Sequence, residues 1–163
     1  MKITINALDP ASVNAAIKKL NQYAKSLDEK AKLLCERLAQ MGAMYAEWNF
    51  SGVLYAGDID YKIDVKQGEG NTYYITANGE TVLLMEFGAG VTHGYGHPQA
   101  EEFGMGPGTY PGQKHAFDPN GWWFKQGDQK IHTYGNAPGM PMYNAAKDLR
   151  NEILKTAQEV FRT

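Results

Sequence analysis

The fold of this chain depends most on residues 13–48, VNAAIKKLNQYAKSLDEKAKLLCERLAQMGAMYAEW. Apolar or small residues recur along this stretch at alternating steps of four and three, which is the spacing of a heptad seam. The seam consists of Val13, Ile17, Leu20, Ala24, Leu27, Ala31, Leu34, Leu38, Met41, Tyr45 and Trp48. The pattern predicts one helix about 54 Å long, at roughly 1.5 Å per residue. Asp9 is its expected N-cap with Pro10 in the first turn, and Gly42 is expected to bend the helix or fray its end.

Two uses of this seam are open from the sequence. A helix of this length is longer than the diameter of a domain of 163 residues, so part of the seam could pack against a partner subunit. Alternatively, the helix lies across its own sheet and its own C-terminal helix. The opposite face is charged and polar throughout, which is typical of a face in contact with water.

Short strands are expected on both sides of the long helix. Residues 1–8 alternate apolar and polar side chains well enough for one strand. Residues 57–66, GDIDYKIDVK, alternate strictly, and residues 72–77, TYYITA, follow after a QGEGN turn. These two segments predict an antiparallel hairpin with one face buried. The apolar run at 81–87 could be a strand or a short helix, because periodicity does not separate the two over so few residues.

The stretch at 88–139 has a different composition. It holds 12 Gly and 5 Pro among 52 residues, together with several aromatic side chains. Segments that lack structure are poor in aromatics, so this one is expected to pack on its own domain or on a neighbour. Within it, residues 121–126 and 130–134 predict two strands of a hairpin around Gly127-Asp128.

The chain closes with an amphipathic helix that begins at Pro141. Its apolar stripe consists of Met142, Ala145, Ala146, Leu149, Ile153, Ala157 and Val160. We therefore expect an α+β fold in which the long N-terminal helix and the C-terminal helix pack on a small antiparallel sheet. Residues 1–163 form a single domain, with a long Gly- and aromatic-rich loop or arm at about 88–121.

Composition excludes several classes of function. Lys plus Arg is 16 and Asp plus Glu is 18, a net charge of −2, so the basic excess of a nucleic-acid-binding protein is missing and sequence-specific nucleic acid is not an expected partner. No apolar run is long enough for a membrane span, the N-terminus does not read as a signal peptide, and a membrane is not expected as a partner. The single Cys35 excludes an intrachain disulfide and a cysteine-based zinc cluster.

No arrangement of residues predicts a catalytic centre. His93, His97 and His115 could hold a metal in a small hydrolase, but the intervening glycines place them in a loop, where the spacing fixes no geometry. The aromatic loop could instead serve a module that binds a peptide or a small molecule. Both remain alternatives. The expectation is a protein that is not an enzyme, with no catalytic residue, no metal and no cofactor.

Two short motifs give the chain a resemblance. Glu86-Phe87-Gly88 lies in mid-chain, and Pro141-Met142-Tyr143 with Ala146 opens the last helix. In this element order the chain resembles the tail-completion, or head–tail joining, proteins of long-tailed phages and prophages. That family typically shows an EFG-Thr-like motif, with Ala89 here at the Thr position, and a Pro-hydrophobic-hydrophobic-x-x-Ala motif before its last helix.

The resemblance implies a structural, non-enzymatic virion component that is made in the host cytoplasm. Such a protein sits as a ring of six copies at the tail or neck, and it meets the connector, the terminator or the tail-tube protein. Contact residues are then the expected functional residues, and the candidates are Phe87, Gly88, Tyr95, Phe103, Tyr110, Trp122, Trp123, Pro141 and Met142. Trp122 and Trp123 should face opposite sides of their strand. Parts of residues 91–120 should be mobile in the free subunit and ordered in the assembly.

Overall fold

The computed structural model describes residues 2–55 and 57–162. In chain order the elements are α1 (Pro10–Ser51), β1 (Lys62–Gln67), β2 (Tyr73–Asn78), α2 (Val82–Phe87), β3 (Trp122–Gln126), β4 (Gln129–Thr133) and α3 (Pro141–Arg162). The α+β fold class is therefore confirmed. The strands form two separate two-stranded antiparallel sheets, β1–β2 and β3–β4.

The long helix forms as the heptad pattern predicts. The Asp9 side chain accepts a hydrogen bond of 3.0 Å from the Ala11 N–H, and Pro10 occupies the first helical position. Gly42 does not fray the end of the helix, because the helix continues past it to Ser51. A Cβ at Gly42 would overlap Ile75 Cδ1 and come within 3.0 Å of Leu149 Cδ2. Glycine here lets β2 and α3 approach the α1 backbone closely.

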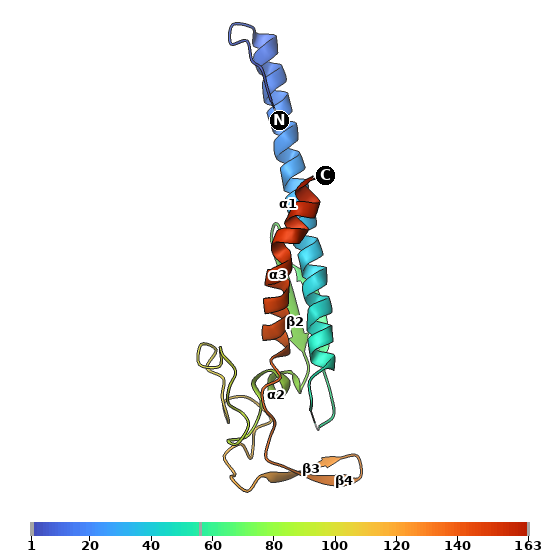
Figure 1. Ribbon diagram of the computed structural model, residues 1–163, viewed down its shortest axis with the longest axis vertical. Coiled ribbons are helices and arrows are strands. Elements are labelled where there is room, and N and C mark those ends of the chain that lie inside the picture. Colours follow the sequence, from blue (N-terminus) through green and yellow to red (C-terminus); the bar gives the residue numbers. More distant parts are fainter. Residues whose placement is uncertain (1, 56, 163) are drawn as a thin grey trace.

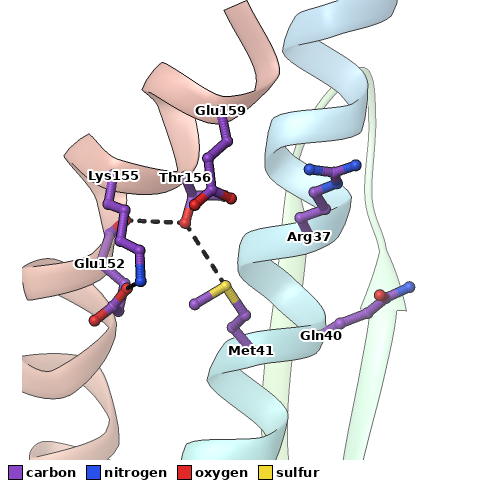
Figure 2. Close-up of a pocket in the computed structure, with 7 residues that line it drawn as sticks. All are labelled: Arg37, Gln40, Met41, Glu152, Lys155, Thr156 and Glu159. Carbon is purple, nitrogen blue, oxygen red and sulfur yellow. Dashed lines mark hydrogen bonds and ion pairs between the residues drawn. The ribbon is translucent and has the colours of Figure 1, made fainter.

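Helix α3 runs antiparallel to the C-terminal half of α1 (Figure 1). The Asn49 amide nitrogen lies 3.4 Å from a carboxylate oxygen of Asp148, and the Thr156 hydroxyl lies 3.7 Å from the Met41 sulfur. Figure 2 shows Thr156 and Met41 pointing toward each other across this interface, while Gln40 points away from it. The Thr156 hydroxyl also donates 2.9 Å to the Glu152 carbonyl, so this buried hydroxyl is satisfied within its own helix.

The core lies where the end of α1 meets α2 and the β1–β2 sheet. Phe50, Val82 and Met85 are buried at its centre, and the Phe50 ring stacks on Tyr61 at 4.6 Å. The register places Ile63 opposite Ala77 on the sheet face that packs on this core. The apolar run that periodicity left undecided is the short helix α2.

Several local predictions need correction. Residues 2–8 form no strand, and Met1 lies outside the described residues. They fold back along the first turns of α1, where the Asn6 N–H donates 2.9 Å to the Ser12 hydroxyl. The β1 strand is shorter than residues 57–66 and begins only at Lys62. Two members of the apolar patterns do not pack in the core: Trp48, at the end of the α1 seam, is 77% exposed, and Ile153, within the α3 stripe, is 43% exposed.

Figure 1 shows three regions along the long axis of the molecule. The N-terminal half of α1 projects from one end. The middle holds the α1–α3 pair with the β1–β2 sheet, and the opposite end holds α2, the loop at 88–121 and the β3–β4 hairpin. The predicted turn at Gly127-Asp128 is confirmed, and Gly127 has a φ of 58°, which suits the first central position of a tight hairpin turn.

Candidate functional site

The Glu86 carboxylate joins the two motifs of the chain. Oε2 accepts a hydrogen bond of 2.7 Å from the Met142 N–H, and Oε1 accepts one of 3.0 Å from the Tyr143 N–H. These N–H groups belong to the first turn of α3, where a helix has no partners of its own for them. Pro141, fully buried at the first position, has no N–H to satisfy. A buried carboxylate from α2 therefore caps α3, and the positive end of the helix dipole stabilises its charge.

His97 attaches the long loop to the same carboxylate. Its Nε2 lies 3.0 Å from Glu86 Oε1, and the two side chains are only 2% and 8% exposed. The Gln99 N–H donates 3.1 Å to Nδ1, so Nδ1 carries no proton and Nε2 must be the donor to Glu86. The Phe87 ring packs on the imidazole at 4.4 Å. His97 thus accepts at Nδ1 from the loop backbone and donates from Nε2 to the Glu86 carboxyl group.

Gly88 ends α2 in a backbone conformation that favours glycine. Its φ is 80°, and a Cβ there would lie 2.7 Å from the Asn136 carbonyl oxygen. The turn brings the segment before α3 against α2: the Asn136 amide donates 2.8 Å to the Leu84 carbonyl, and the Gly139 N–H donates 2.8 Å to the Met85 carbonyl. The Gly139 bond satisfies a carbonyl at the end of the helix, whereas the Leu84 carbonyl also accepts a hydrogen bond of 3.1 Å from the Gly88 N–H.

The long loop is also tied to Gly88. Its carbonyl accepts hydrogen bonds from the Tyr110 hydroxyl and, at 3.2 Å, from the Gln113 side-chain amide. Burial raises the pKa of Tyr110 to about 12, because the phenolate would lose its hydration there. We call the set of Glu86, Gly88, His97, Tyr110 and the first turn of α3 the motif junction.

A cavity of about 460 Å³ opens beside the motif junction. It is mostly apolar, with the edge-on rings of Phe87 and Phe103 at a centroid distance of 6.4 Å. Of its polar side chains, Glu86 and His97 already bind each other, and the Gln99 amide donates to Glu102. The cavity is lined by Ala77, Val82, Leu83, Glu86, Phe87, His97, Gln99, Phe103, Met105, Met142, Tyr143 and Ala146. Such a lining suits an apolar side chain or a small apolar ligand.

The structure divides the nine candidate contact residues into two groups. Five meet at or beside the motif junction: Phe87, Gly88, Tyr110, Pro141 and Met142. The others lie in the loop and the hairpin, outside this cluster: Tyr95, Phe103, Trp122 and Trp123. Phe103 nevertheless reaches the rim of the cavity.

The prediction that the two tryptophans face opposite sides is confirmed. Trp122 is half-buried and its ring lies at 6.5 Å from His115, whereas Trp123 is 66% exposed. Tyr110, expected as an anchor on a neighbour, has its hydroxyl bound inside its own chain.

Glu86 and His97 play structural parts that sequence reasoning did not assign. From the sequence, Glu86 is only a member of a short motif, and His97 is only a possible metal ligand. One signal was available, because an acidic residue inside the apolar run VLLMEFG needs a buried partner. Nothing local identified that partner as a helix start 56 residues further along the chain.

The histidines of the hydrolase alternative do not gather into a metal centre. Within residues 2–55 and 57–162, no group of three or more His, Cys, Asp or Glu side chains is placed to hold a metal ion. His97 binds Glu86 and His115 packs beside Trp122. In the same part of the chain, no helix is long and apolar enough to cross a membrane.

Comparison of the chain with protein families, with curated proteins and with solved structures found no match. A functional conclusion therefore depends on the residues and the geometry described above.

Proposed function

We propose that this chain is a structural subunit of a phage or prophage tail. It would complete the tail, or join it to the head connector, as part of an oligomeric ring. Its contacts in the particle would be further copies of itself and the neighbouring connector, terminator or tail-tube protein.

The observation that carries the proposal is the motif junction. The two motifs behind the resemblance are 55 residues apart, counted from Glu86 to Pro141, yet they form one buried unit. Glu86 of the first motif supplies the cap for the helix that the second motif opens. Two motifs whose residues bind each other support the resemblance more strongly than two short sequence matches with no contact between them.

Apolar surface left uncovered supports an assembly role. Large apolar side chains stay exposed in several regions of the chain. These include the free half of α1, the end of α1 at Trp48 and Leu54, and the loop and hairpin at Phe117 and Trp123. Exposed apolar patches of this kind mark sites of protein contact. Aromatic side chains in particular contribute much of the binding energy at such contacts.

A binding module is the second candidate, and the cavity beside Phe87 and Phe103 favours it. Its volume of about 460 Å³ falls in the range of small-molecule sites. In the tail role the same cavity would receive an apolar side chain of a neighbouring subunit. A ligand-dependent rise in melting temperature with a small apolar compound, in the absence of any assembly partner, would favour the module.

Deletion of the gene from the phage or prophage that encodes it tests the proposal. Negative-stain images should show either filled heads beside separate tails, or tails of abnormal length. The first outcome assigns the joining role and the second assigns the termination of tail growth. A plasmid copy of the native chain should restore normal particles. Normal, infectious particles without the gene would overturn the proposal.

Loop ordering offers a second test on the purified protein. Residues 91–120 are predicted to exchange amide hydrogens faster in the free subunit than in assembled particles, because ordering a flexible segment needs neighbour contacts. The anchored points near Tyr110 and Gln113 should show the smallest difference. Equal exchange throughout the segment in both states would contradict the prediction.

A further inference from the structure

Within residues 2–55 and 57–162, no other helix lies beside the N-terminal half of α1. The contacts Asn49–Asp148 and Met41–Thr156 set the antiparallel register between α1 and α3. Continued to the end of α3, this register brings Arg162 level with Cys35. Residues 10–34 of α1 therefore extend beyond α3 by about 37 Å, as the projecting end of the helix in Figure 1 shows. We call residues 10–34 the arm.

The arm carries the same heptad seam that packs further along the helix. Leu38, Met41 and Tyr45 are partly buried in the covered half, and so is Leu34 at the end of the arm. On the arm, Ile17 and Leu20 are each 50% exposed, and Leu27 is 37% exposed. Residues 2–8 fold back near Ser12 and leave these side chains exposed. The apolar seam thus continues without a change of spacing from a covered interface to an uncovered one.

We propose that the arm pairs with the arm of a second copy of this chain as an antiparallel two-helix coiled coil. The second helix would continue, along the arm, the position that α3 occupies along the rest of α1. The pairing is symmetric, so each copy contributes the same seam. It does not rest on the proposed tail function and concerns the free protein.

The identity of the second helix follows from the fit between two copies of the same seam. In an antiparallel pair the seam layers coincide when Ile17 faces Leu27 of the second copy and Leu20 faces Ala24 of the second copy. This register places Pro10 of the second copy level with Leu34, so it ends just short of the position where α3 ends. A shift by one heptad would place Pro10 of the second copy level with Met41, where α3 already lies.

The body of the molecule disfavours a parallel pair. Beyond Cys35 the seam lies against the chain's own α3, so a parallel second helix would have to leave the seam there. Both copies would also carry their α3 helices and sheets at the same end. The antiparallel pair instead places the two bodies at opposite ends.

The flanks of the seam are compatible with this pairing. In the proposed register Asp28 lies beside Asn14 of the second copy. Lys30 lies level with Ala16 of the second copy, which is already buried within its own chain at 4% exposure. No like charges oppose each other at these positions. The remaining lysines of the arm, Lys18, Lys19, Lys25 and Lys32, lie on the outer positions of the heptad.

Sedimentation of the full chain over a range of concentrations tests for the dimer. We expect a monomer–dimer equilibrium, and Leu20→Lys should weaken it about tenfold or more, because each dimer loses two buried leucine contacts. Gln22→Lys, which adds the same charge on the outer face, should leave it unchanged. A monomer at every concentration would overturn the proposal, and so would an oligomer that Leu20→Lys leaves intact.

Disulfide cross-linking fixes the orientation, because Cys35 is the only native cysteine. In a Cys35→Ser background, Tyr23→Cys should cross-link to itself, since position 23 lies next to the symmetry axis. Ile17→Cys alone should not cross-link, whereas a mixture of Ile17→Cys and Leu27→Cys should give the mixed dimer. Self-cross-linking of Ile17→Cys without the mixed product would show a parallel pair and overturn the proposed geometry. Loss of the dimer would leave the gene-deletion result untouched, so failure here and failure of the tail function are distinguishable.

Discussion

The arm and the motif junction lie toward opposite ends of the molecule and use their side chains in opposite ways. At the junction a buried carboxylate, a histidine and a tyrosine find all their partners inside the chain. On the arm, the apolar residues that recur with heptad spacing stay exposed to solvent. The junction is therefore completed by one chain, while the arm presents surface that a single chain does not cover.

The difference follows from where each region finds its hydrogen bonds. A helix makes its backbone bonds locally, so the arm can form without a partner, although packing would normally supply most of its stability. The junction depends on contacts between segments far apart in sequence, such as Asn136 with Leu84. We expect slow amide exchange at the junction and faster exchange on the arm.

Replacing Glu86 should have the largest effect on stability. Glu86→Ala leaves the N–H groups of Met142 and Tyr143 and the Nε2–H of His97 without an acceptor in a buried site. We expect a loss of about 3 kcal/mol or more in the free energy of unfolding, since each unsatisfied buried donor costs on the order of 1–3 kcal/mol. Urea unfolding followed by circular dichroism measures it.

The exposed Glu80 provides the matched control. Its own carboxylate faces solvent, so Glu80→Ala should change stability by less than about 0.5 kcal/mol. Equal effects of the two substitutions would mean that the junction does not hold α3 in place. Glu86→Gln should fall between them, because its amide N–H₂ would face one of the three donors.

Tyr110 gives the junction a dependence on alkaline pH. Its pKa in the folded chain is about 12, above the ordinary tyrosine value of 10.0. Above pH 10 the unfolded chain loses this proton while the folded chain keeps it, so stability falls as pH rises toward 12. The contribution of this one group to that fall is about 2 to 3 kcal/mol.

Tyr110→Phe separates this contribution from the rest of the chain. The variant should lose about 1 kcal/mol at neutral pH, because the hydrogen bond to the Gly88 carbonyl is removed. Its stability should then fall less steeply than the native chain's between pH 10 and 12. Tyr55 and Tyr61, whose pKa values burial also raises, remain in both proteins. Parallel stability curves from pH 9 to 12 would contradict the assignment.

Gly42 tests the covered half of α1 itself. Gly42→Ala gains about 1 kcal/mol of helix propensity, but its methyl group would overlap Ile75 and crowd Leu149. Overpacking costs about 1–3 kcal/mol, so we expect a net loss of up to about 2 kcal/mol by thermal or urea unfolding. Gly52→Ala is the control, because its Cβ would come no closer than 3.7 Å to its neighbours. A net gain from Gly42→Ala would show that β2 and α3 can move away from α1.

The sequence predicted the elements whose signals are local. The heptad steps, the Asp9 cap and the Gly127-Asp128 turn each depend on neighbouring residues, and all three are present in the structure. The α3 helix begins at Pro141 as expected. The strand at 1–8 failed because alternation alone supplies no partner strand, and the segment instead follows the first turns of α1.

The candidate site was only partly predictable. The two motifs named Phe87, Gly88, Pro141 and Met142, which do meet. Their connection through Glu86 was not visible, because a carboxylate and a distant helix start carry no shared local pattern. The role of His97 was hidden for a similar reason: its place in a Gly-rich loop fixes no geometry, and its actual partner is Glu86.

The smallest expected effect comes from the same substitution made at two positions of the seam, one on the arm and one in the covered half. It tests the difference between the two halves of α1 most directly. Leu20 on the arm is 50% exposed, whereas Leu38 in the covered half is less exposed and partly buried. In the monomer, Leu20→Ala should change the free energy of unfolding by less than about 0.5 kcal/mol, and Leu38→Ala should cost about 1–3 kcal/mol. Urea unfolding at concentrations well below dimer formation isolates this difference.

At higher protein concentration Leu20→Ala should become costly while the effect of Leu38→Ala stays constant, because only the arm gains its packing from the second copy. If the two variants instead behave alike at every concentration, the arm is covered within its own chain in solution, and the contrast between the two halves of α1 does not hold.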